Sequence, residues 1–182
     1  MVVKRSEVDL YGLRPTWVEI NLEALRFNVN SIKTHLPDGV KVMAVVKADA
    51  YGHGHKRVAR CLQDMGVHDF GVAIAEEGQK LRESGITGNI LVFGGCYPTQ
   101  EEIFFEYSLV PTIYDLPTLK AFSKVAEQKG KQFSYHLKVD TGMGRLGIGP
   151  YDIHKFLQKA RSYKGIDLTG IFSHLSSSRS SK

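Results

Sequence analysis

The chain has 182 residues, enough for one domain with a substantial core, and its 42% hydrophobic and 24% charged residues are ordinary for a soluble globular protein. The formal net charge of +5 suits an anionic small ligand. Runs of five or six basic residues are missing, which argues against nucleic acid as a partner. No apolar run reaches about 18 residues, so no membrane span is expected. Only Cys61 and Cys96 carry thiols, which favours a reduced, cytoplasmic setting.

The first third of the chain alternates between strand and helix patterns. Residues 16–20 alternate as a strand does, and Asn21 is a good N-cap for a helix that runs to about His35. Residues 41–46 are almost continuously apolar, which predicts a strand buried on both faces. A loop is expected over 49–54, followed by a helix that ends at Gly66.

The same alternation continues to the last strand. Further strands are expected over residues 69–74, 89–93, 109–114, 132–139 and 167–173. The helices between them span 75–83, a segment capped by Thr99, a segment between Asp115 and Gly130, and a segment that begins at Pro150. Strict alternation predicts an α/β fold with a parallel sheet. The six strands counted from Lys41 fit an open doubly wound sheet and an incomplete (β/α)8 barrel equally well.

The polar segment 176–182 follows the last strand without a closing helix. It is either a flexible tail or the sign of a chain that stops partway through its fold. The second interpretation is favoured because a parallel strand normally needs a crossover helix to cover it. We therefore expect one partial domain over residues 1–175.

Lys47 stands where the buried strand 41–46 ends, at the position where parallel α/β folds place their active sites. A lysine there either extends its amine to solvent or serves as a base or Schiff-base former. In the loop that follows, Gly52 and Gly54 allow close backbone approach to a ligand, and Tyr51 offers a phenol for a phosphate. His53 and its neighbour His55 are a weak signal for a metal, because no third ligand stands at a recognised spacing.

A second polar cluster follows the strand 132–139. Lys138 and Asp140 share one face of that strand, and Arg145 lies in the glycine-rich loop at its mouth. The arginine could bind a carboxylate or phenolate oxygen, or the three side chains could form an ion-pair set that fixes the loop. His174, just past the last strand, is by itself more typical of a structural or surface residue.

Two segments carry a resemblance to a known family. Val-Lys-Ala-Asp-Ala-Tyr-Gly-His-Gly at 46–54 resembles the pyridoxal phosphate attachment motif of alanine racemases, and Leu-Lys-Val-Asp-Thr-Gly-Met-Gly-Arg-Leu-Gly at 137–147 resembles their second signature. Residues 16–20 and 170–174 match further strands of that family, in the same order. The resemblance implies a barrel of fold type III that uses pyridoxal phosphate, rather than an open sheet.

The resemblance also implies a role for each candidate residue. Lys47 would hold the cofactor as an internal aldimine and act as one of two bases, and Tyr51 would hydrogen-bond the phosphate. Arg145 would contact the cofactor's phenolic oxygen and the substrate carboxylate. Lys138 is often carbamylated in this family, and His174 would belong to the hydrogen-bond chain of the second base.

The implied activity is the interconversion of L- and D-alanine, which supplies D-alanine for peptidoglycan, by a cytoplasmic homodimer. The second base of the family is a tyrosine of the partner subunit's C-terminal β domain, and this domain and the last two barrel strands are missing from the sequence. Two alternatives therefore stay open. One is a racemase of broader specificity that acts on serine, lysine or arginine, and the other is an inactive truncated module that binds pyridoxal phosphate.

Overall fold

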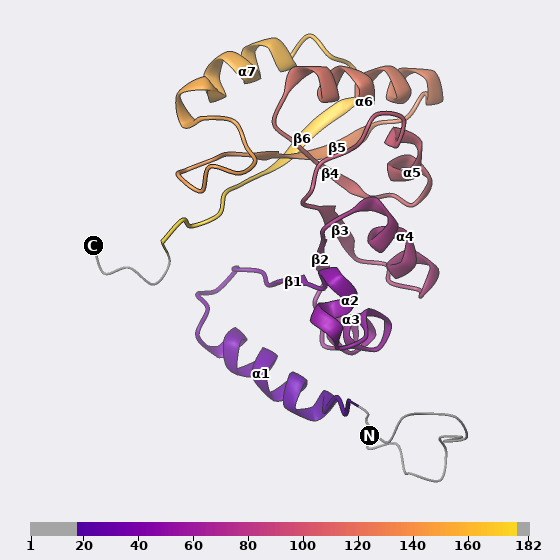
Figure 1. The fold of residues 1–182 in the computed structure, drawn as a ribbon, viewed down its shortest axis with the longest axis vertical. Helices are drawn as coiled ribbons and strands as arrows, with labels where there is room; N and C mark the ends of the chain where they lie inside the picture. The colour runs from indigo at the N-terminus through magenta and orange to yellow at the C-terminus, as the bar shows by residue number, and fades with distance from the viewer. Residues whose placement is uncertain (1–17, 178–182) are drawn as a thin grey trace.

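A computed structural model describes residues 18–177 and shows a sheet of six parallel strands that alternate with helices (Figure 1). The strands are β1 (Met43–Val45), β2 (Asp69–Val72), β3 (Asn89–Val92), β4 (Val110–Ile113), β5 (Phe133–Lys138) and β6 (Ile166–Phe172). Each strand pairs in parallel with the next one along the chain. All six carboxyl ends therefore lie at one edge of the sheet.

The spatial order β1-β2-β3-β4-β5-β6 decides between the two expected architectures. A doubly wound sheet reverses its strand order at a switch point, whereas a barrel adds each strand beside the previous one. The sheet is also strongly curved. Neighbouring strands lie about 4.8 Å apart, so in a flat sheet β3 and β6 would be about 14 Å apart. The ring centroids of Phe93, just after β3, and Phe172 in β6 are nevertheless 5.9 Å apart. The fold is therefore part of an α/β barrel.

The helices begin and end where local capping chemistry places them. Asn21 and Asp115 accept the amide hydrogens of Ala24 and Thr118 through their side chains, and Gly130 adopts the left-handed conformation that ends α6. No helix among residues 18–177 has the length and apolar character needed to cross a membrane. The helices are α1 (Leu22–Thr34), α2 (Lys47–Gly52), α3 (His55–Asp64), α4 (Ala75–Glu83), α5 (Glu101–Glu106), α6 (Leu116–Lys129) and α7 (Ile153–Ala160), with a 3-10 turn, η2 (Pro150–Asp152), before α7.

The strand expected over 41–46 is shorter than predicted and is not buried on both faces, because β1 covers Met43–Val45 and Val45 is 40% exposed at the edge of the sheet. Two further expected local features are wrong. Residues 18–20 form no strand, and residues 16 and 17 lie outside the described part of the chain. Thr99 is not the cap of α5, because Gln100 occupies that position while Thr99 adopts a positive φ of 74°. In both cases the residue type allowed the predicted role, but the backbone of the folded chain takes another conformation.

The core lies between the sheet and its helices. Phe104 of α5 packs edge-on against Phe122 of α6, with ring centroids 5.3 Å apart, and Phe122 in turn lies 4.9 Å from Phe133 of β5. The first two rings are fully buried. Such aromatic contacts contribute about 0.5–1.5 kcal/mol each beyond the burial of their area. This cluster fixes α5 and α6 on the sheet and thereby the position of the β5 carboxyl end.

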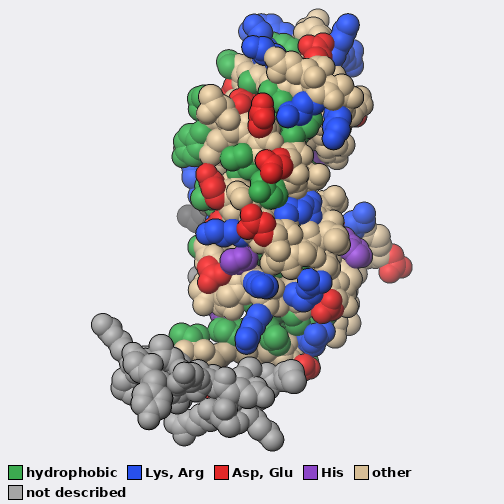
Figure 2. All heavy atoms as spheres, turned by 90° about the vertical axis from the view of Figure 1, so that its right-hand side faces the viewer, with side chains coloured by type: hydrophobic (Ala, Val, Ile, Leu, Met, Phe, Trp, Pro, Cys, Tyr) green, Lys and Arg blue, Asp and Glu red, His purple; other side chains and the backbone are tan. Residues whose placement is uncertain are grey.

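The outer and edge surfaces differ in character. Figure 2 shows acidic and basic side chains interspersed over the visible face. The two edge strands, in contrast, expose apolar side chains: Val45 in β1, and Leu168 and Ile171 in β6. The inner strands β2 to β4 bury almost all of theirs. Each edge strand therefore has the apolar composition typical of a strand that is covered by a neighbouring strand.

Candidate active site

Lys47 lies directly after β1, at the carboxyl-terminal edge of the sheet. Its side chain is half-buried, and its Nζ lies 5.9 Å from the centroid of the Tyr51 ring. The Tyr51 side chain itself is 60% exposed, so its hydroxyl is free to meet a ligand. The structure thus places an amine and a phenol at one strand mouth, as the sequence predicted.

The segment after Lys47 is not the irregular loop that the glycines indicated. Ala48, Asp49, Ala50 and Tyr51 have φ between 51° and 55° and ψ between 39° and 51°, which is one turn of left-handed helix. This conformation costs roughly 1–2 kcal/mol for each residue that has a Cβ. Four such residues in a row persist only where surrounding contacts hold them, and such strain is characteristic of functional sites. Sequence reasoning missed this turn because none of these four residues is a glycine.

Two carboxylates hold the turn from its two sides. The Asp49 carboxylate accepts the amide hydrogen of His55 at 2.7 Å and also contacts the His55 ring. The hydrogen bond from this amide is the main reason why the pKa of Asp49 lies below its ordinary value. On the other side, Glu77 Oε1 accepts the amide hydrogen of Ala48 at 2.7 Å, and its Oε2 accepts that of Ala73 at 2.7 Å.

The sequence did not single out Glu77. It stands at the third position of α4, where a glutamate commonly reaches back to an amide before the helix. That signal predicts a bond to the amide of Ile74, the N-cap residue, whereas the observed bond reaches Ala73, one residue earlier. The bond to Ala48 depends on how β1 and β2 pair, and local sequence does not contain this information.

Lys138, the last residue of β5, is almost completely buried, with 7% of its surface exposed. Its Nζ lies 4.4 Å from the centroid of the Phe172 ring on β6, a cation–π distance. Burial lowers the pKa of this amine, and the nearby Arg145 guanidinium lowers it further, while Asp140 opposes them weakly. The site therefore favours the neutral form of the amine more than water does.

Asp140 and Arg145 belong to the loop after β5, and they do not form an ion-pair set with Lys138, which was one of the two alternatives for this cluster. The Asp140 carboxylate instead accepts the amide hydrogens of Gly142 and Gly144, both at 3.0 Å. These bonds hold the pKa of Asp140 below its ordinary value. The side chain of Arg145 is exposed. Among residues 18–177, no salt bridge joins any two of these three side chains.

The loops after β5 and β6 are tied together by hydroxyl groups. Ser173 donates to the carbonyl oxygen of Val139 at 2.8 Å and shares a hydrogen bond of 2.6 Å with the Thr141 hydroxyl. The next residue, His174, is exposed at the same edge of the sheet. The structure thus brings His174 to the loop that carries Arg145, without a direct contact between the two side chains.

The candidate residues form two groups at one edge of the sheet. Lys47 and Tyr51 lie beyond β1. Lys138 is the last residue of β5, and Arg145 and His174 lie beyond β5 and β6. No hydrogen bond, ion pair or ring contact links the two groups within the described residues, because β1 and β6 do not pair. His53 and His55 are engaged with the carbonyl oxygens of Ala50 and Tyr51 and with Asp49, respectively.

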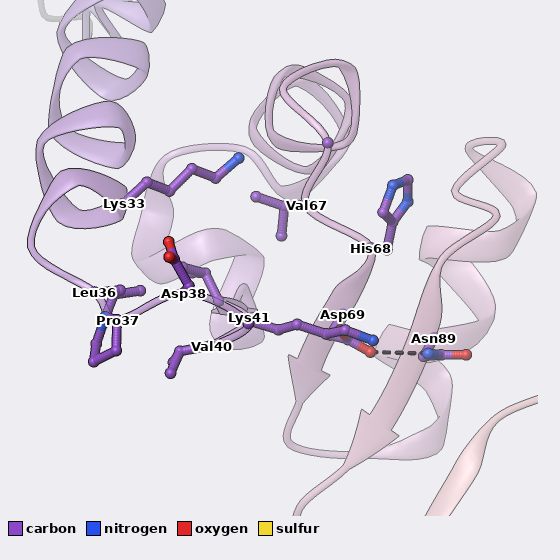
Figure 3. A pocket seen from close by; sticks show the side chains of 13 residues that line it. Lys33, Leu36, Pro37, Asp38, Val40, Lys41, Val67, His68, Asp69 and Asn89 are labelled. Carbon is purple, nitrogen blue, oxygen red and sulfur yellow. Dashed lines mark hydrogen bonds between the residues drawn. The ribbon is translucent and has the colours of Figure 1, made fainter.

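A cavity of about 510 Å³ lies at the opposite edge of the sheet (Figure 3). Asp69 and Asn89, the first residues of β2 and β3, are hydrogen-bonded at its side, and Lys33 and Lys41 also line it. Barrel enzymes place their chemistry at the carboxyl ends of the strands. This cavity is therefore separate from the candidate active site.

Comparison with known proteins points to one family. The family model "Alanine racemase, N-terminal domain" matches residues 20–182. Alanine racemase of Halothermothrix orenii is 43% identical over 164 residues, which cover 90% of this chain and 43% of that protein. This chain therefore spans less than half the length of that curated relative.

Solved structures agree with the sequence comparison. Alanine racemase of Clostridium difficile 630 in complex with cycloserine superposes with a TM-score of 0.84 at 37% identity, over 90% of this chain and 45% of that one. Alanine racemase of Bartonella henselae with covalently bound pyridoxal phosphate gives 0.77 at 27% identity, over 86% and 45%. Histidine racemase of Leuconostoc mesenteroides gives 0.78 at 25% identity, over 85% and 41%.

The curved parallel sheet and the lysine at the mouth of β1 define part of an α/β-barrel protein with its polar site at the carboxyl ends of the strands. Within this class, the chain belongs to the alanine racemase N-terminal domain family.

Proposed function

We propose that the whole protein is a racemase that interconverts L- and D-alanine with pyridoxal phosphate. The observation that carries this proposal is the position of Lys47, at the mouth of β1 beside Tyr51, in a chain that belongs to this family. Bound pyridoxal phosphate supplies the electron sink that makes the α-proton of an amino acid removable.

The side chains at this edge fit the cofactor by their chemistry. A primary amine, a phenol and a guanidinium match an aldehyde, a phosphate and an oxyanion, respectively. In this proposal, Lys47 holds the cofactor and moves the proton on one face of the α-carbon, and Tyr51 donates to the phosphate. Arg145 pairs with the phenolic oxygen and with the substrate carboxylate.

Lys138 and His174 have supporting roles in the proposal. The lowered pKa of Lys138 increases the neutral fraction of its amine, which is the form that reacts with carbon dioxide. Carbamylation would turn this amine into an anion close to Arg145 and would orient the guanidinium. His174 orients the second base through a hydrogen bond.

The described residues contain six barrel strands, whereas a closed barrel of this type has eight. We propose that residues 1–175 contribute the first part of the barrel and that activity also needs a further part with the second base. A homodimer would supply that base from the partner subunit. Cysteines without a disulfide partner support a cytoplasmic protein, and supply of D-alanine for peptidoglycan is the role we propose for it.

The proposal is tested by measuring D-alanine formation from L-alanine by the full protein and two variants. Lys47→Ala should abolish turnover, whereas Lys41→Ala, a change at an exposed residue before β1 and at the opposite edge of the sheet, should leave it within about twofold. Equal activity of the wild type and Lys47→Ala would contradict the assigned role. Absence of turnover in the wild type with every L-amino acid tried would contradict racemase function and favour an inactive module that binds the cofactor.

A racemase of broader specificity is the second candidate, because one of the structural neighbours is a histidine racemase. A panel of L-alanine, L-serine, L-lysine, L-arginine and L-histidine separates the two candidates. A kcat/KM at least tenfold higher for alanine than for the others supports an alanine racemase. Comparable values across the panel support the broader enzyme.

A further inference from the structure

Glu77 is the one carboxylate in the described residues that joins the backbones of two strand ends at the candidate site. Its two oxygens accept the amide hydrogens of Ala48 and Ala73, each at 2.7 Å. Ala48 immediately follows Lys47, and Ala73 immediately follows β2. We call this arrangement the Glu77 clip.

The amide that Glu77 binds at Ala48 belongs to the peptide group between Lys47 and Ala48. The orientation of this peptide sets the direction in which the Lys47 side chain leaves the backbone. It also lies where the backbone changes from negative to positive φ, since Val46 has a φ of −118° and Ala48 a φ of 51°. A hydrogen bond to a carboxylate is about twice as strong as one between neutral groups. The clip thus acts at the residue where the strained conformation begins.

From this geometry we infer that Glu77 is a positioning residue for Lys47, which holds the left-handed turn in the conformation that presents the amine to the site. The inference rests on the proposed function in so far as Lys47 binds pyridoxal phosphate. The alternative is that Glu77 only caps α4. A cap acts on amides at the start of α4, such as that of Ala73, and does not need the bond to Ala48.

The neighbouring Glu76 provides a matched control. It lies in the same first turn of α4, carries the same charge near the helix amino end, and accepts a hydrogen bond from Gln100 outside the clip. Glu77→Gln and Glu76→Gln therefore remove one charge each from the same helix end. Only Glu77→Gln removes an acceptor from the clip and places an NH₂ group near a backbone amide.

The first readout is amide hydrogen exchange in the full chain without added cofactor. In Glu77→Gln, the Ala48 amide should exchange at least about tenfold faster than in the wild type, as expected for the loss of a charge-assisted hydrogen bond. Glu76→Gln should leave it unchanged. If the Glu77→Gln variant does not fold, the exchange rate of the Ala48 amide in the wild type tests the inference by itself. An Ala48 amide that exchanges at the rate of an unstructured peptide overturns the inference.

The second readout is the rate at which pyridoxal phosphate and borohydride label Lys47, followed by peptide mapping. Glu77→Gln should lower this rate about tenfold, and Glu76→Gln should not change it. Adding Ala48→Gly to Glu77→Gln should restore part of the rate, about threefold, because glycine adopts a positive φ without the Cβ penalty. A residue that only caps the helix would show no such rescue.

The outcomes separate this inference from the proposed function. Failure of wild-type Lys47 to be labelled contradicts the proposed function, and amide exchange still reports on the clip. Labelling of Lys47 at the wild-type rate in Glu77→Gln, with a faster Ala48 amide, overturns the positioning role alone.

Discussion

The Nζ of Lys138 lies 4.4 Å from the centroid of the Phe172 ring, so the last residue of β5 and the last residue of β6 meet on the concave side of the sheet. The ring covers an amine that is already almost fully buried. A charged lysine in this position loses most of its hydration, and the face of an aromatic ring compensates for only part of that loss. The pair therefore links the packing of the two strands to the protonation of Lys138.

This relationship predicts a pH dependence of stability. The pKa of Lys138 lies below its ordinary value of 10.5, mainly because of burial and then because of Arg145. Between the lowered pKa and 10.5, the unfolded chain binds more protons than the folded one, so the contribution of Lys138 to the free energy of unfolding rises with pH. Below the lowered pKa, the Lys138 amine is charged in both the folded and the unfolded chain, and its buried charge destabilises the folded state.

Urea unfolding of the wild type and Lys138→Met at a series of alkaline pH values checks this prediction. The stability advantage of Lys138→Met should be largest near neutral pH and should shrink as the pH rises toward 10.5. Equal pH slopes for the two proteins would show that Lys138 titrates alike in the folded and unfolded chains.

The aromatic cluster predicts a large loss of stability on truncation. Phe122 is fully buried between Phe104 and Phe133, so Phe122→Ala should lower the free energy of unfolding by about 3–5 kcal/mol. Phe27 of α1 is 73% exposed, and Phe27→Ala should change the free energy of unfolding by less than about 0.5 kcal/mol. Denaturant titration of both variants gives the comparison. Similar losses at the two positions would contradict the assigned core.

Parts of this fold were accessible from sequence because their causes are local. Asp115 and Gly130 bound α6 through a side-chain cap and a left-handed residue, and both signals are read directly from residue type. The wrong assignment at Thr99 has the same origin, because a hydroxyl side chain permits a cap without requiring one. The residue pattern by itself did not give the order of the strands in the sheet. The family resemblance implied a barrel, and the pairing of each strand with the next one confirms it.

The sequence predicted some residues of the candidate site and missed others. Lys47 and Tyr51 were found because a strand end and a family signature coincide there. The left-handed turn between them was missed, since residue type argues against it and contacts from elsewhere impose it. Glu77 was missed for the same reason, as its partner Ala48 lies 29 positions away in sequence. The mutual placement of Lys138 and Phe172 likewise depends on the pairing of β5 with β6.

The open edges predict self-association of the 182-residue chain. Ile171 in β6 is 57% exposed, and Leu168 on the same strand is also exposed. An unpaired apolar edge favours contacts between chains. Sedimentation should show oligomers whose fraction falls at least about twofold in Leu168→Lys with Ile171→Lys. Val18→Lys, a charge added at an exposed residue outside the sheet, should have little effect. A cooperatively melting monomer of the unchanged chain would contradict the prediction.

The incomplete barrel also predicts the activity of these 182 residues by themselves. In our proposal they supply Lys47, and the second base comes from a further part of the protein. The purified chain should therefore racemise alanine no faster than free pyridoxal phosphate does. Racemisation clearly above that reference would mean that residues of this chain supply both bases.

The central claim is that Lys47 is the residue that binds the cofactor. The most direct test treats the full protein with pyridoxal phosphate, reduces it with borohydride and maps the modified peptide by mass spectrometry. We predict one dominant label on Lys47, absent from Lys47→Ala and retained in Lys41→Ala. A label spread over surface lysines, or a dominant label on another residue, would contradict the claim.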